Sequence, residues 1–132
     1  AGSADLVLAF RNVHSWMGAG TLDATFAAAY AALKPGGVFG VVQHRASDGR
    51  SVERMRETAY VSEAHVIAAA QGAGFVLDAR SEINANPKDP ADHATGVWEL
   101  PPSLRGKESE REEKLAIGES DRMTLRFRKP QG

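Results

Sequence analysis

Residues 5–42, DLVLAFRNVHSWMGAGTLDATFAAAYAALKPGGVFGVV, hold the pattern that decides the fold. Two short runs within this segment, residues 5–10 and 38–42, are nearly all apolar, which is typical of strands covered on both faces in a parallel sheet. Between the runs, Thr21 is a suitable N-cap, and the Lys-Pro-Gly-Gly phrase at 34–37 ends a helix. The apolar residues at helical spacing are Leu22, Phe26, Ala29, Tyr30 and Leu33. The segment predicts a right-handed strand–helix–strand unit with a parallel pair of strands.

Within this first unit, we expect a loop over residues 11–20. The next part of the chain repeats the order with longer connections, and we expect a short helix or ordered loop over 52–58. Ser62 is a good N-cap for a helix that runs to residue 73. A third strand begins at Phe75 and runs towards Ile83.

The last part of the chain combines a long irregular segment with a terminal strand. Residues 84–105 contain four prolines, and a loop of this length in a small domain is usually a lid or a binding loop. Residues 107–114 predict a charged surface helix that Gly118 stops. Residues 123–128 alternate between apolar and polar side chains, which predicts a half-covered, antiparallel strand.

Composition excludes several classes of function. The chain has 132 residues, of which 42% are hydrophobic, and this size and balance suit one compact domain. It has no cysteine, so it forms neither a disulfide nor a thiolate metal site. Its net charge of −1 provides no basic excess for binding nucleic acid or an anionic membrane. We expect no membrane span and no signal peptide, and the compartment is left open.

Polar residues follow the first two predicted strands, at the edge of the sheet where open α/β folds bind ligands. Residues 11–16 (RNVHSW) and 43–45 (QHR) would converge there, although polar residues after strands often only cap turns. The long loop, with His93 and Trp98, would either close over a substrate or pack as a surface loop. The four histidines lack metal-ligand spacing, so we expect no metal site. A glycine-rich turn after the first strand and an acidic residue after the second, as in a Rossmann-type binder, are absent.

Five phrases in this sequence resemble the class I S-adenosylmethionine-dependent methyltransferases, and in particular a bacterial group of predicted methyltransferases. The phrases are DLVLAFRNVHSW (5–16), ALKPGGVFGVVQHR (32–45), SEINANPKD (81–89), GVWELPPSL (96–104) and AIGESDRMTLRF (116–127). The Leu-Lys-Pro-Gly-Gly phrase is widespread in class I methyltransferases, and the others are specific to the smaller group. Together they span almost the whole chain.

The resemblance implies an α/β fold with part of a Rossmann-like methyltransferase sheet. Such enzymes have seven strands, the last antiparallel, and this chain would begin at the fourth strand. We therefore expect about four strands with flanking helices, and we expect residues 1–132 to be the carboxyl-terminal portion of the domain. The first three strand–helix units, roughly 90 residues, would be missing.

The resemblance also implies which residues form the site. The segment after the first strand would line S-adenosylmethionine, with Phe10, Arg11, Asn12 and Val13 as the cofactor-binding residues and His14 beside the transferred methyl group. The residues expected to face the acceptor are Trp16, His44, Arg45, Asn86 and Trp98. The family usually has a glutamate where this chain has Gln43, so we assign Gln43 no acid or base role.

Methyl transfer is an in-line displacement on a sulfonium carbon, so the protein mainly positions the nucleophile, removes a proton and excludes water. His14 or His44 would serve as the base near neutral pH, and Trp16 would lie against the cationic centre. The expected reaction is methyl transfer to a small-molecule acceptor in the longer protein, with weak or no cofactor binding by this chain alone. The alternative is a non-catalytic half-Rossmann module that pairs with another chain, and a nicotinamide-dependent oxidoreductase ranks below both because it needs the same missing glycine turn.

The first predicted strand also bears on assembly. Residues 5–10 are apolar on both faces and would form a bare edge, which favours pairing with another copy of the chain or with the missing amino-terminal part. We therefore expect a dimer or higher assembly through this strand.

Overall fold

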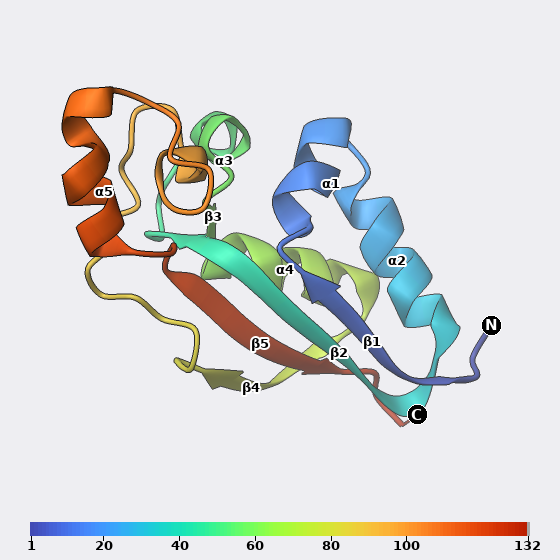
Figure 1. Ribbon diagram of the computed structural model, residues 1–132. Helices are drawn as coiled ribbons and strands as arrows, with labels where there is room; N and C mark the ends of the chain where they lie inside the picture. The colour runs from blue at the N-terminus through green and yellow to red at the C-terminus, as the bar shows by residue number, and fades with distance from the viewer. Residues whose placement is uncertain (132) are drawn as a thin grey trace.

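The computed structural model describes residues 1–131 (Figure 1). Its sheet has the order β1-β2-β5-β4, with a short strand β3 (Val61–Ser62) added at the end of β2. The four main strands are β1 (Ala4–Phe10), β2 (Leu33–Ala46), β4 (Val76–Ser81) and β5 (Arg122–Arg128). Strand β1 pairs parallel with β2, whereas β5 is antiparallel to both β2 and β4. The predicted fold class, an α/β sheet of about four strands with the last antiparallel and helices flanking it, is confirmed.

Three helices cover one face of this sheet: α1 (Val13–Ala19), α2 (Leu22–Ala32) and α4 (Glu63–Ala73). The core beneath them contains a cluster of phenylalanines, in which Phe26 of α2 packs edge-on against Phe39 of β2 at 5.1 Å between ring centroids. Phe39 in turn contacts Phe75 and Phe127, so helix and sheet share one continuous core. The remaining helices are α3 (Val52–Thr58) and α5 (Arg111–Ile117), and Figure 1 shows them near the end of the sheet where β1 and β2 finish.

The structure corrects the loop predicted for residues 11–20. Residues Val13–Ala19 form helix α1, and Gly20 caps it with a left-handed backbone (φ 73°). Val13 and Met17 lie one turn apart on the same side of α1, and both are buried in the core. Burial of this short apolar stripe outweighs the polar, glycine-containing composition that favoured a loop.

Two element boundaries also differ from the prediction. Strand β2 starts at Leu33 and includes the Lys-Pro-Gly-Gly phrase, because Gly36, with φ 81°, donates its N–H to the carbonyl of Lys129 at 2.8 Å. The charged surface helix begins later than predicted, at Arg111, after a 3₁₀ turn at Glu108–Glu110. Gly118 follows its last residue, as expected.

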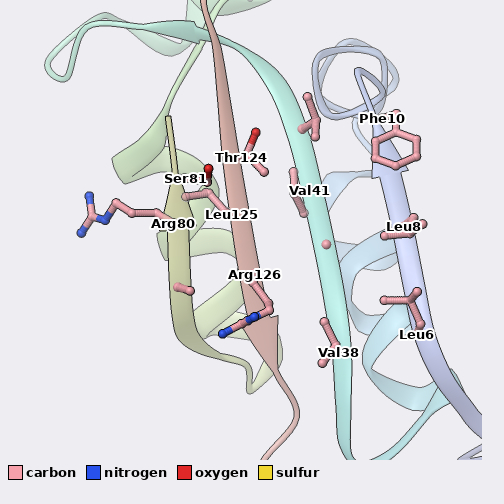
Figure 2. A pocket seen from close by; sticks show the side chains of 13 residues that line it. Leu6, Leu8, Phe10, Val38, Val41, Arg80, Ser81, Thr124, Leu125 and Arg126 are labelled. Carbon is pink, nitrogen blue, oxygen red and sulfur yellow. The ribbon is translucent and has the colours of Figure 1, made fainter. Parts of the chain in front are cut away.

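The face of the sheet opposite the helices is open and apolar (Figure 2). Leu6, Leu8 and Phe10 alternate along β1, and each side chain is more than half exposed (53%, 53% and 56%). With Val38 and side chains from β4 and β5 they line a shallow groove of about 370 Å³. Within residues 1–131, β1 pairs only with β2, so its outer edge has no partner strand. An exposed apolar face of this kind marks a surface that another segment covers.

Candidate functional site at the carboxyl edge of the sheet

Residues from three strands meet where the parallel strands β1 and β2 end. Arg11 and His14 follow β1, His44 lies near the end of β2, and Ser120 and Arg122 lie at the start of the antiparallel β5. His44 and Arg122 are directly opposite each other in the β2–β5 register. The two polar clusters predicted after the first two strands are therefore brought to one edge.

His14 lies in the first turn of α1, where Gln43 of β2 holds it. Gln43 is fully buried, and its amide nitrogen donates to the carbonyl of Ala59 at 2.7 Å. Its amide group also reaches His14, with the side-chain oxygen 3.3 Å from both the His14 backbone nitrogen and Nδ1. Because an amide offers both a donor and an acceptor, Gln43 fits either neutral tautomer of His14. With the proton on Nδ1 and donated to Gln43, Nε2 keeps a free lone pair.

Burial lowers the pKa of His14 below its usual value, and the hydrogen bond to Gln43 opposes this only in part. The ring of His44 lies 5.5 Å from that of His14, and its Nδ1 is hydrogen-bonded to the Ser120 hydroxyl. Burial, and then the charges of His14, Arg122 and Arg11, lower the pKa of His44 to about 3. Both imidazoles are therefore neutral at pH 7, and His44 is the weaker base.

Trp98 of the long loop lies beside this pair of histidines, with its ring edge-on to His14 at 6.4 Å between centroids, and lines a pocket together with His44. It lies in a 3₁₀ turn at Val97–Glu99. The turn sits against α3, because Gly96 (φ 95°) approaches Thr58 so closely that an added Cβ would lie 2.6 Å from the Thr58 Cα atom. Only glycine fits at that approach.

A buried polar network holds the long loop on the domain. Asp89 accepts hydrogen bonds from the Tyr60 hydroxyl at 2.7 Å and from the backbone nitrogens of Ala91 and Asp121 at 2.9 Å. The Nε2 atom of His93 lies 2.9 Å from the same carboxylate. Burial acts to raise the pKa of Asp89, but these hydrogen bonds outweigh it and lower the pKa.

A second part of this network joins the loop to α5. Lys114 lies 2.9 Å from Nδ1 of His93 and 3.1 Å from the carboxylate of Glu99. Thr95 donates to Glu99 through both its backbone nitrogen and its hydroxyl at 2.7 Å. Burial acts to raise the pKa of Glu99, yet Thr95 and Lys114 lower it to about 2. The loop is thus a packed, hydrogen-bonded cover.

Three other residues predicted to face the acceptor have their side chains engaged by other protein groups. Arg45 is held by three carboxylates, those of Asp121, Glu63 and Glu82, at 2.8 to 3.1 Å, and these hydrogen bonds raise its pKa. The amide of Asn86 donates to the carbonyls of Ile117 and Glu119 at 2.8 and 2.7 Å. Trp16 packs edge-on against Phe26 of the core at 6.3 Å.

The four residues predicted to bind the cofactor differ in how far their side chains are exposed. Val13 is fully buried in the core, so only its backbone is available to a ligand. Asn12 precedes α1 with an exposed side chain that makes no capping hydrogen bond. Arg11 is exposed at the end of β1, whereas Phe10 lies on the open face (Figure 2).

Ser120 and Arg122 line this edge but are not among the predicted site residues. The signal was present, because an antiparallel last strand begins at the edge where the parallel strands end. In the described part of the chain, no group of three or more His, Cys, Asp or Glu side chains is placed to hold a metal ion. None of the helices among residues 1–131 is long and apolar enough to cross a membrane.

Comparisons with known proteins bear on the fold. No family model matches the sequence, and no curated protein matches it. Among solved structures, the [4+2]-cyclase SpnF matches 99% of this chain and 52% of its own length, with a TM-score of 0.67 and 18% identity. The Haemonchus contortus phosphoethanolamine N-methyltransferase 2 matches 98% of this chain and 34% of its own, with a TM-score of 0.60 and 19% identity.

A third match is the S-adenosylmethionine-dependent methyltransferase of Mesorhizobium loti, which covers 97% of this chain and 63% of its own length, with a TM-score of 0.55 and 16% identity. This chain thus spans from about a third to just under two-thirds of the length of these three proteins. At such identities the likeness concerns the fold alone. The chain has the fold of the S-adenosylmethionine-dependent methyltransferases.

Proposed function

We propose that the carboxyl edge of this sheet is the acceptor side of an S-adenosylmethionine-dependent methyl-transfer site. The observation that carries this proposal is the meeting of His14 and His44 beside Trp98 at the ends of two neighbouring parallel strands. This is where ligands bind in open α/β sheets. The acceptor is a small molecule, and the complete site belongs to a longer protein that adds further strand–helix units to β1.

The residues around the end of β1 fit one end of the cofactor. Asn12 offers a free amide, and Arg11 and Val13 offer backbone groups beside it. Within residues 1–131, no glycine-rich turn follows a strand to cradle the adenosine end of the cofactor. The described residues therefore offer groups for one end of S-adenosylmethionine only, which supports a role for strand–helix units that precede β1 in holding the rest of the cofactor.

When bound, S-adenosylmethionine supplies a methyl group on a sulfonium sulfur, and the sulfur takes the bonding electron pair as a neutral thioether when an acceptor atom attacks the methyl carbon. His14 accepts the proton that the acceptor loses, through Nε2, while Gln43 holds Nδ1. His44 has too low a pKa to be an effective base, so we give it the task of orienting the acceptor. Trp98 and the loop around it exclude water.

Calorimetric titration of S-adenosylhomocysteine tests the proposal. One sample is this chain, and the other is a version extended by the residues encoded upstream of Ala1. Binding by the extended version alone is the expected result. Binding by neither version contradicts methyl transfer, and equal binding by both contradicts the need for preceding units.

A second candidate function is a non-catalytic module that assembles with another chain. The observation in its favour is the open apolar face with the unpaired edge of β1. We assign that face to the same preceding strand–helix units, because the chain matches only 52% of the length of SpnF and an apolar sheet face needs a covering layer. The titration separates the two functions, since an assembly module binds no S-adenosylhomocysteine in either version.

A further inference from the structure

A small pocket lies beside His44, between the start of β5 and the loop that carries Trp98. Its volume is about 200 Å³, below the roughly 300–1,000 Å³ of sites for drug-sized ligands, so it suits a small group. Its polar lining comes from Arg11, Arg122, His44, Ser103 and Ser120. No carboxylate of the described chain lines it, and the rest of its wall is apolar, formed largely by Trp98 and the Leu-Pro-Pro segment that follows Glu99.

Arg122 has a donor without a protein partner. Its side chain is only 17% exposed, and one terminal nitrogen contacts the carboxylate of Glu119 at 3.2 Å. Its Nε atom, however, is buried and has no hydrogen-bond partner among the described residues. A buried N–H without an acceptor is costly, so Arg122, which lines the pocket, is not fully satisfied by its protein contacts.

Arg11 brings a second positive charge to the pocket in an unusual backbone conformation. Its φ of 59° lies in the left-handed region, which side chains other than glycine adopt at an energetic cost. Its backbone nitrogen donates to the carbonyl of Val42, which ties this turn to the neighbouring strand. Among residues 1–131 no carboxylate forms an ion pair with Arg11.

The electrostatics of His44 agree with a positive pocket. Burial is the main reason that the pKa of His44 is lowered, and the nearby cationic groups, Arg122 and Arg11 among them, lower it further, while Asp89 acts in the opposite direction. His44 therefore remains neutral at pH 7, so the positive charge at the pocket comes from the two arginines. Arg11 has no ion pair among the described residues, and Arg122 pairs only with the exposed carboxylate of Glu119, which lies outside the pocket lining, so the two arginines favour an anionic group in the pocket.

We propose that this pocket binds a carboxylate group of the methyl acceptor. Arg122 and Arg11 pair with the carboxylate, and the apolar body attached to it lies against Trp98 and the neighbouring prolines. A planar carboxylate suits the forked donors of arginine. The proposal rests on the proposed function only in naming the ligand as the methyl acceptor.

Benzoate is a suitable probe, because it joins a carboxylate to a small apolar ring, and benzamide is its uncharged counterpart. The test uses this chain with Trp16→Phe, so that Trp98 is the only tryptophan and reports on the pocket by fluorescence. We expect saturable quenching by benzoate and at least about tenfold weaker quenching by benzamide. The double variant Arg11→Gln, Arg122→Gln should weaken benzoate binding by a similar factor. Arg126→Gln, on the same strand but paired with Asp78, is the matched control and should leave it unchanged.

Equal binding of benzamide and benzoate would overturn the proposal, as would a folded double variant that binds benzoate normally. Displacement of benzoate by inorganic phosphate more readily than by acetate would overturn the assignment to a carboxylate. The comparison of benzoate with benzamide uses the intact pocket, so it decides the question even if the double variant does not fold. The test needs no cofactor, so its failure is distinguishable from failure of the S-adenosylhomocysteine titration.

Discussion

His14 is the single residue on which the proposed chemistry depends most. Its Nδ1 is held by Gln43, and its ring lies close to both His44 and Trp98. Burial keeps its pKa below the usual 6.5, so it is neutral and able to accept a proton at pH 7. A general base of this kind typically contributes ~10²–10⁴-fold to a rate.

We predict that His14→Ala in the extended protein lowers turnover by ~10²–10⁴-fold, measured as S-adenosylhomocysteine released. A base acts in its deprotonated form, so activity of the unsubstituted protein should be constant above pH 6.5 and fall as the pH drops through the lower pKa of His14. His65→Ala, on α4, is the matched control and should keep full turnover. Unchanged turnover in both His14→Ala and His44→Ala would rule out the proposed mechanism.

At this scale the sequence predicts which polar residues reach the carboxyl edge, but not which contacts they make there. Polar residues after parallel strands necessarily meet at one edge, so the meeting of His14 and His44 follows from local patterns. Arg45 has the same position in the pattern, yet its carboxylate partners lie 18, 37 and 76 positions away. No local signal identifies partners at such separations. The roles of Arg45, Asn86 and Trp16 towards the acceptor stay predictions.

At the scale of elements, the loop at residues 84–105 is shaped by a few buried polar residues. The prolines and the length of this segment predict an irregular, functional loop. They do not predict its docking, which depends on Asp89 meeting Tyr60, His93 and the start of β5. The sequence does not predict helix α1 for a related reason, because the stability of this helix comes from burying Val13 and Met17 rather than from its own composition.

We predict that Asp89→Asn lowers the free energy of unfolding by about 2–4 kcal/mol, because the buried carboxylate accepts several hydrogen bonds that an amide cannot all replace. Chemical denaturation at pH 7 measures the loss. Asp92→Asn, at an exposed position three residues away, is the control and should change the free energy of unfolding little.

The pH dependence of stability gives a second check on Asp89. Its pKa is lower in the folded chain than in the unfolded one, so its contribution is present above the unfolded pKa and is lost as the pH falls through the folded pKa. The unsubstituted chain should therefore lose more stability than Asp89→Asn on acidification. Identical acid profiles for the two would contradict this role for Asp89.

At the scale of the whole molecule, the helices cover one face of the sheet and leave the other open. Leu6, Leu8 and Phe10 make that face apolar next to an unpaired strand edge. The sequence predicts this edge, because an apolar strand at the end of a sheet needs a neighbour.

We predict that this chain alone forms a dimer or larger assembly at micromolar concentration, since burying the open face removes apolar surface from water. Light scattering measures the mass. Leu8→Lys should shift the chain towards monomer, whereas Leu115→Lys, at an equally exposed position on α5, should not. A monomeric mass for the unsubstituted chain would refute assembly through β1.

The most direct test of the central claim is photolabelling of the extended protein with S-adenosylmethionine that carries a tritiated methyl group. Ultraviolet irradiation followed by peptide mapping locates the residues next to the methyl group. If the carboxyl edge of β1 lines the transferred methyl, label appears in the peptide containing residues 10–16, and excess S-adenosylhomocysteine suppresses it. Label that is absent from this peptide but competed by S-adenosylhomocysteine elsewhere in the protein would contradict the account.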